Sequence, residues 1–234
     1  YGTYNLTISL WSSTAETYAK THPNQTKKTF DRIKENLLYL SKINKKTKIV
    51  IANVISNLNY HELEKMLEFA KEVKASEVYL TMIDPIEDET ASLLLNKEQQ
   101  NELKKSFEKI YERYKKSYYG TLKIDNPNNF LRRISNKSVT TGRYDNNIIY
   151  KIPCTVGWTF SRIMANGDVA PCCRGVMVAT GNINKQNFKD IWNGKKQLMF
   201  RKIGVALKKH PKFVEKVGCL KTCDNLMENK ENYE

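Results

Sequence analysis

The chain has 234 residues, 40% of them hydrophobic, which is enough to form one large domain or two small ones. No apolar run approaches the roughly 18 residues that a membrane-spanning helix needs, and the first residues do not resemble a secretory signal. Composition therefore argues against membrane and secreted proteins, and we expect a cytoplasmic location. The chain opens at Tyr1, directly before a strand-like stretch, which indicates a piece of a longer protein.

The formal net charge of +14 is carried mainly by lysine, in basic pairs that are spread along the chain. A basic surface is typical of nucleic-acid-binding proteins. Solvated helix faces in a lysine-rich protein give the same charge, and we favour this interpretation because the basic residues do not form one block. The pairs are Lys27-Lys28, Lys115-Lys116, Arg132-Arg133 and Lys208-Lys209.

The N-terminal half alternates between apolar runs and segments with apolar residues at helical spacing. The runs predict strands buried in a parallel sheet, and the alternation predicts right-handed β/α units in a barrel or a doubly wound sheet. In both architectures functional residues lie at the carboxyl ends of the strands. The predicted strands are Leu6–Trp11, Lys48–Val54 and Glu77–Ile83, and the first predicted helix is Lys27–Ile43.

Two later helices begin with the sequence pattern of a capping box, in which two side chains satisfy backbone N–H groups at the helix start. Asn59 with Glu62 predicts one box, and Asn96 with Gln99 predicts the other. The polar residues 12–26, between the first strand and the first helix, are expected to form a loop.

From about Lys123 to Tyr150 the periodic pattern breaks down. Pro127, several asparagines and a polar run predict a linker or a mobile connection there. The tail after Asp224 is polar, and we expect it to fray.

A hairpin is predicted inside the segment that carries three of the cysteines. Phe160–Met164 and Val169–Cys172 are extended runs that flank Asn166-Gly167, the dipeptide that best tolerates a two-residue type I′ turn. Such a turn would pair Ser161 with Cys172.

Five cysteines without a secretory signal indicate a metal or cluster site rather than a disulfide framework. Cys154, Cys172, Cys219 and Cys223 are separated by 17, 46 and 3 residues, and neither end has the Cys-x2-Cys spacing usual in zinc ribbons. Iron–sulfur clusters accept varied spacings, because each thiolate binds a different iron. Cys173 follows Cys172 in the predicted strand, so we expect its side chain on the opposite face. Four thiols are therefore predicted to converge, and buried unligated cysteines are the alternative.

Residues 154–224 resemble the SPASM or Twitch extension of radical S-adenosylmethionine enzymes. The resemblance implies that Cys154, Cys172, Cys219 and Cys223 hold one auxiliary 4Fe–4S cluster, as in the single-cluster Twitch form. The closing Cys-x3-Cys departs from the commoner Cys-x2-Cys. The matching motifs, in chain order, are Cys154, Asn166-Gly167, Val169–Cys173, Gly181–Ile183, Phe188–Trp192, Phe200-Arg201, Cys219 and Cys223.

A four-iron cube with four cysteine ligands has no open position, so we expect this cluster to handle electrons rather than to bind substrate. Apolar residues near the cysteines are expected to limit water access and thereby to help set the cluster's potential. These residues are Trp158, Phe160, Ile163, Val169 and Trp192.

Residues 1–125 are similar to the second half of the partial (β/α)6 barrel of the same enzymes, and the three predicted strands resemble its fourth, fifth and sixth. The resemblance implies that Ser9 reaches the ribose end of S-adenosylmethionine and that Asn53 contributes to the same cofactor site. The implied fold is α/β, the C-terminal half of a partial radical-SAM barrel followed by a small α+β SPASM/Twitch domain with a β-hairpin. Its parts are the barrel (1–125), a linker (126–151), the cluster domain (152–226) and a tail (227–234).

The resemblance also implies a radical S-adenosylmethionine oxidoreductase or maturase that oxidises or modifies a small molecule or a peptide. The full-length enzyme would bind S-adenosylmethionine and a second 4Fe–4S cluster, and would receive electrons from a donor such as flavodoxin or ferredoxin. The radical-generating cluster needs Cys-x3-Cys-x2-Cys, which this sequence lacks, so we expect the chain to be inactive alone and assign no catalytic residue. The alternative is a non-enzymatic four-cysteine zinc module with a basic nucleic-acid-binding surface, which metal analysis would distinguish.

Overall fold

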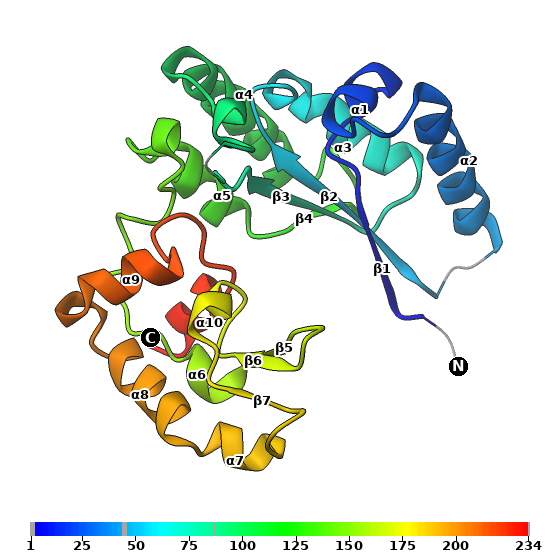
Figure 1. Ribbon diagram of the computed structural model, residues 1–234. Helices are drawn as coiled ribbons and strands as arrows, with labels where there is room; N and C mark the ends of the chain where they lie inside the picture. Colours follow the sequence, from blue (N-terminus) through cyan, green and yellow to red (C-terminus); the bar gives the residue numbers. More distant parts are fainter. Residues whose placement is uncertain (1–2, 44–45, 87, 234) are drawn as a thin grey trace. The chain divides into compact units, whose positions relative to one another are not determined.

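The computed structural model describes residues 3–43, 46–86 and 88–233, and it divides into two compact units, Tyr1–Gly142 and Arg143–Glu234 (Figure 1). The outermost residues of the predicted barrel and tail, 1–2 and 234, lie outside the described residues. Each unit has its own sheet and its own buried side chains.

The first unit is built on a parallel sheet of four strands in the order β1-β2-β3-β4. Its strands are β1 (Asn5–Ser9), β2 (Lys48–Ile55), β3 (Glu77–Met82) and β4 (Lys123–Ile124). Its α-helices are α1 (Ala15–Thr21), α2 (Lys27–Ile43), α3 (Leu63–Glu72), α4 (Lys97–Lys115) and α5 (Pro127–Ile134). Short 3-10 turns cover Tyr60–Glu62, Ala91–Leu93 and Val139–Thr141.

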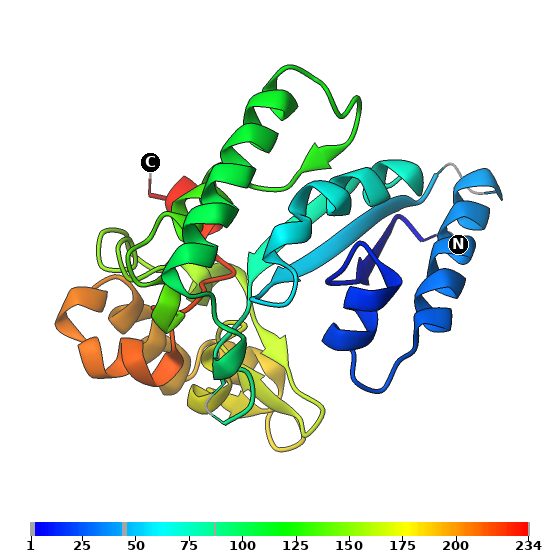
Figure 2. The ribbon, with the colours of Figure 1, turned by 90° about the horizontal axis from the view of Figure 1, so that it is seen from above.

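The two faces of this sheet differ in burial. On β2, Ile49, Ile51 and Ile55 are at most 3% exposed, whereas the alternating residues Val50, Ala52 and Val54 are only partly buried. Strands that follow one another in the sheet through crossovers of one hand place their helices on the same face. Figures 1 and 2 show these helices packed along the sheet, so the more deeply buried face is the one they cover.

Two helix starts that look alike in sequence differ in structure. At Asn96 the predicted capping box is present, because Asn96 accepts from the backbone of Gln99 and Gln99 accepts from that of Asn96. At Asn59 the predicted box is wrong, since this side chain makes no cap bond. Its amide instead donates to the carbonyls of Trp11 and Val54, at 2.7 and 2.8 Å, and so ties two strand ends together.

The polar loop predicted at 12–26 contains a helix, α1. Thr14 caps it by accepting from the backbone N–H of Thr17 at 3.2 Å, and Tyr18 buries its ring against Phe30 of α2. The helix has only seven residues, and this is too short for an apolar stripe to stand out in the sequence.

The segment predicted as a linker, 126–151, contains α5, and the division between the units falls after Gly142. Phe130 and Ile134 of α5 are buried, and the ring of Phe130 meets that of Phe107 edge-on at 4.9 Å. The asparagines at 126, 128 and 129 suggested a loop, but two of them lie inside α5, and only Asn126, directly before the helix, adopts a left-handed conformation with φ 42°.

The second unit combines a three-stranded antiparallel sheet, in the order β5-β6-β7, with short helices around a small core. Its strands are β5 (Arg162–Ile163), β6 (Asp168–Ala170) and β7 (Gly181–Asn182). Its α-helices are α6 (Val156–Thr159), α7 (Phe188–Trp192), α8 (Lys195–Gly204), α9 (Pro211–Val217) and α10 (Leu226–Glu231), with 3-10 turns at Gly175–Val178 and Leu207–Lys209.

The predicted hairpin is present, but its turn and register differ from the prediction. Arg162 pairs with Ala170, and the backbone N–H of Gly167 donates to the carbonyl of Met164 at 2.9 Å, so the loop holds three residues rather than two. Gly167 takes φ +84°, whereas Asn166 does not adopt a positive φ. A type I turn followed by a left-handed glycine has this form. The pairing of Ser161 with Cys172 is therefore wrong by one residue.

The polar end of the chain also differs from the expected frayed tail, because α10 begins at Leu226 and buries both Leu226 and Asn229. Among the described residues, none of the helices is long and apolar enough to cross a membrane.

Candidate metal centre

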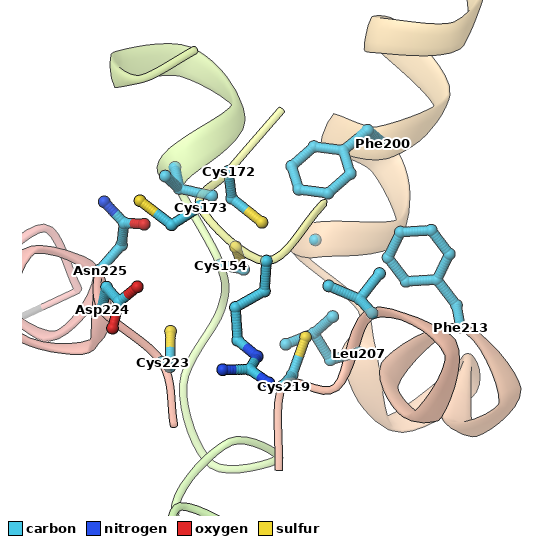
Figure 3. Close-up of a pocket in the computed structure, with 14 residues that line it drawn as sticks. Cys154, Cys172, Cys173, Phe200, Leu207, Phe213, Cys219, Cys223, Asp224 and Asn225 are labelled. Carbon is cyan, nitrogen blue, oxygen red and sulfur yellow. The ribbon is translucent and has the colours of Figure 1, made fainter. Parts of the chain in front are cut away.

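Four cysteines from three separate segments of the second unit line one cavity (Figure 3). Cys154 precedes α6, Cys172 follows β6, and Cys219 and Cys223 follow α9. The fifth cysteine, Cys173, lies at the same cavity, and all five are free thiols that are partly buried.

The thiols lie close enough together to influence one another. The pKa of Cys172 is raised to about 11 and that of Cys219 to about 12, chiefly by burial, and the neighbouring thiol of Cys154 contributes to both increases. Burial also raises the pKa of Cys223 well above its usual value, with added contributions from Cys154 and Cys219. Without a cation such thiols are neutral, whereas a bound metal would favour the thiolates.

Cys173 is set apart from the other four thiols, although it contributes to the raised pKa of Cys172. Burial raises the pKa of Cys173 itself, and the next influence is the carboxylate of Asp224 rather than another cysteine. Figure 3 shows the sulfur atoms of Cys172 and Cys173 on opposite sides of the backbone. We predicted this orientation from the alternation of side chains along a strand, and that reason is wrong, because both residues lie in a bend and turn after β6 and not in a strand. That Cys173 is not a ligand remains a prediction.

A buried aspartate positions the closing cysteine pair. Asp145 is fully buried, and its carboxylate accepts from the backbone N–H of Cys223 at 2.6 Å. Its own N–H donates to the carbonyl of Leu220 at 3.0 Å, so Asp145 contacts both ends of the loop. This negative charge also contributes to the raised pKa of Cys223.

An arginine lies against the same loop. Arg174 donates to the hydroxyl of Thr222 at 2.9 Å, and its charge lowers the pKa of Cys219 relative to what burial alone would give. The guanidinium packs over Gly218, which takes φ +75° and would place a Cβ 3.3 Å from it. The loop 219–223 is therefore held between opposite charges, those of Asp145 and Arg174.

The first cysteine is held by the end of the chain. Asn229 of α10 accepts from the backbone N–H groups of Thr155 and Val156, at 2.7 and 3.2 Å, and it lowers the pKa of Cys154 relative to what burial alone would give. Gly204 of α8 closes the other side, because its carbonyl accepts from the N–H of Cys154 and a Cβ at 204 would lie 2.6 Å from the Cys154 carbonyl.

Sequence reasoning did not find Asp145, Arg174 or Asn229 as parts of the site. Asp145 and Asn229 lie within the segments that we expected to be a linker and a tail, and Arg174 directly follows the cysteines. None carries a motif, because each acts through a partner at least 48 residues away in the chain.

The apolar lining of the cavity also differs from the residues that we expected. Val156, Phe200, Leu207, Phe213 and Val217 line it. Of the predicted residues, Trp158 and Ile163 are 47% and 53% exposed, and Trp192 stacks on Phe188 and lies 4.8 Å from the guanidinium of Arg201. The wall that limits water access therefore comes mainly from α8 and α9.

Within the described part of the chain, no group of three or more His, Cys, Asp or Glu side chains has the arrangement that a single metal ion requires. The donor set of the cavity, four thiols in an apolar wall, is of the kind that holds an iron–sulfur cluster.

The two residues predicted to contact S-adenosylmethionine lie on opposite faces of the first unit's sheet. Ser9 pairs with Ala52, which places it on the less buried face, where its hydroxyl accepts from the indole N–H of Trp11 at 2.7 Å. Asn53 follows Ala52 on β2 and points to the helix-covered face, where it is fully buried. Its amide atoms have no hydrogen-bond partner among the described residues. The structure therefore does not bring Ser9 and Asn53 into one site.

A comparison with family models bears on the second unit. Residues 154–224 match SPASM, described as an iron-sulfur cluster-binding domain. This match lies within the second unit, Arg143–Glu234. The cavity of this unit and its four converging thiols fit the cluster that this family binds. No curated protein matches the chain in sequence.

Among solved structures, the chain is similar to SuiB of Streptococcus suis. SuiB bound to S-adenosylmethionine matches with a TM-score of 0.57 and 16% identity, over 84% of this chain and 44% of SuiB. A second SuiB structure gives 0.54 over 85% and 45%, and SuiB bound to its precursor peptide SuiA gives 0.50 over 84% and 44%, both at 16% identity. This likeness shows a shared α/β fold with a parallel sheet, and the chain spans less than half of SuiB. The SPASM match bears out the predicted resemblance of residues 154–224, and the likeness to SuiB adds the shared fold.

Proposed function

We propose that this chain is the barrel half and SPASM domain of a radical S-adenosylmethionine maturase, and that its second unit holds one auxiliary 4Fe–4S cluster. The observation that supports this most is the meeting of Cys154, Cys172, Cys219 and Cys223 at one cavity. When bound, such a cluster supplies reversible one-electron transfer. The first unit would be the fourth to sixth strands of the partial (β/α)6 barrel.

The residues of the chain have distinct tasks in this proposal. The four thiols bind irons, and Asp145, Arg174 and Asn229 orient the loops that carry those thiols. The apolar side chains of α8 and α9 exclude water, which strengthens the influence of the nearby charges on the cluster's potential. Because each iron has a thiol ligand, substrate does not bind to the cluster.

For the substrate we propose a peptide. The support is the similarity in fold to SuiB, one of whose structures contains the precursor peptide SuiA. Ser9, on the open face of the sheet, is the residue that we propose for contact with the ribose of S-adenosylmethionine. Generation of the radical requires a three-cysteine motif that this sequence lacks.

The test is anaerobic reconstitution of the full chain with iron and sulfide, followed by metal analysis and electron paramagnetic resonance of the reduced protein. We expect about four irons and four sulfides per chain and a cluster signal that Cys172→Ala abolishes. One equivalent of tightly bound zinc, with no iron or sulfide retained, would contradict the proposal and support a zinc module.

A further inference from the structure

A basic groove lies on the surface of the second unit, beside the thiol cavity. Lys151, Lys208 and Lys209 line it together with the apolar residues Ile152, Pro153 and Leu207. Lys208 and Lys209 belong to the 3-10 turn after α8, and Lys151 lies shortly before Cys154. Three positive charges and an apolar floor thus come together from two segments.

The floor of this groove is also a wall of the metal centre. Leu207 lines both the groove and the thiol cavity. Ile152, Pro153 and Leu207 line the groove and also a smaller cavity beside Cys154, Cys219 and Cys223. Leu207 is 7% exposed and belongs to the core against which these three cysteines pack. A single layer of side chains therefore separates the bottom of the groove from the cysteine sulfurs.

The lysines of the groove are available to a partner. All three are exposed, and none forms an ion pair within the part of the chain that the structure describes. The residues lining the groove include no aspartate or glutamate among those described. Such a surface attracts acidic proteins and raises the rate at which they bind.

We propose that a small acidic electron-carrier protein docks in this groove and exchanges electrons with the SPASM cluster through the layer at Ile152, Pro153 and Leu207. This inference rests on the proposed function, because it requires the cluster. In the direction of reduction, the reduced flavin anion of a flavodoxin loses one electron and the oxidised cluster gains it. No bond forms or breaks, and no proton moves. Charge complementarity and the position of the groove carry the proposal.

The test compares two charge reversals on the full chain, reconstituted anaerobically. Lys208→Glu with Lys209→Glu changes the groove, and Lys195→Glu with Lys196→Glu is the matched control. The control pair is adjacent in sequence, exposed, in the same unit and outside the groove. Both double variants alter the net charge equally, so a difference between them reports position rather than total charge.

The readout is stopped-flow electron transfer between the cluster and a flavodoxin, followed by the absorbance of the flavin radical, in the direction that the two measured potentials favour. At low salt we expect the groove variant to slow transfer by about tenfold or more, while the control changes it less than twofold. Salt should slow the wild-type protein towards the rate of the groove variant. Transfer with reduced methyl viologen, a small cation that needs no docking surface, should not slow in either variant.

Each outcome bears on a different claim. If the groove variant matches the wild type, or if both pairs slow transfer equally, the docking proposal is overturned and the cluster assignment stands. If the groove variant loses affinity for an acidic peptide and not for flavodoxin, the occupant is a peptide and the proposal is also overturned. If the wild-type protein holds no iron and sulfide, or if methyl viologen cannot reduce them, the proposed function itself fails.

Discussion

The two units satisfy their buried polar groups in different ways. In the first unit, the buried carboxylate of Glu62 accepts from the backbone and hydroxyl of Ser13 and from the hydroxyls of Thr14 and Thr17. These donors lie in the segment after β1, so the carboxylate fastens one strand-end loop to the next. In the second unit, the thiols face apolar side chains and one another, and burial raises their pKa values, so the protein alone favours the neutral thiols over the thiolates.

This difference indicates which unit depends on a ligand. The polar cluster around Glu62 is complete within the protein, so we expect the first unit to fold without a cofactor. The loop that carries Cys219 and Cys223 contributes little apolar burial beyond Leu220, and we expect its order to depend on the bound cluster.

Loss of the cluster should have the largest effect on stability, and it should affect only the second unit. Chelating the iron anaerobically, or replacing Cys172 with Ala, should lower the melting temperature of the second unit by more than about 10 °C, because ligand binding is then no longer coupled to folding. The transition of the first unit should remain where it was. Differential scanning calorimetry with hydrogen exchange can assign the two transitions, and a matching shift in both would show that the units do not differ in this way.

Removing the carboxylate of Glu62 should have the next largest effect on stability, and this effect should fall on the first unit. Glu62→Ala leaves buried donors without an acceptor and should cost about 3 kcal/mol of the free energy of unfolding. The matched control is Glu68→Ala, because Glu68 is exposed and lies in α3, directly after Glu62. This substitution should cost less than about 0.5 kcal/mol. Urea unfolding measures both, and the iron content of the second unit should not change. Equal costs at the two positions would contradict the role given to Glu62.

Charges beside the thiol loop should change the cluster's reduction potential. Asp145→Asn removes a negative charge next to Cys223 but retains an acceptor oxygen, so the reduction potential should rise by on the order of 60 mV, about 1.4 kcal/mol. Arg174→Gln removes a positive charge and should lower the potential. Redox titration followed by electron paramagnetic resonance measures both. Shifts of the same sign would mean that loop geometry, rather than charge, sets the potential.

The smallest effect is expected at Cys173. Cys173→Ala should keep the iron content and the absorbance of the cluster, because this thiol faces Asp224 rather than the other four. Cys172→Ala, its neighbour in sequence, is the control and should lose most of the absorbance. Loss of iron in the Cys173 variant would show that the ligand set has been assigned incorrectly.

Local signals predicted much of the fold. The bounds of α2 and the capping box at Asn96 agree with the structure because each depends on residues within one helix. Asn59 shows where such signals fail. Its pattern with Glu62 fits a capping box, but both side chains instead form hydrogen bonds with partners about 48 residues away, Asn59 with Trp11 and Glu62 with Thr14.

The candidate site shows the same limit. The four thiols could be proposed from their spacing and from the family pattern, and the structure does bring them to one cavity. The residues that position these thiols could not be predicted from the sequence, because Asp145 and Asn229 bind partners 78 and 74 residues away in the chain. The orientation of Asn53 could not be predicted either. Alternation along a strand shows which residues share a face of the sheet, but not which face the helices cover.

The separation of the ligands along the chain has a consequence for biosynthesis. Cys154 and Cys223 lie 69 positions apart. At about 5–20 residues per second, a ribosome needs roughly 3–14 seconds to make the last ligand after the first. During that interval Cys154 and Cys172 are nascent thiols without their partners, open to oxidation and to stray metal ions. Cluster delivery to this protein must therefore follow completion of the Cys219–Cys223 loop, and oxygen exposure during translation should lower the yield of holoprotein more than the same exposure afterwards.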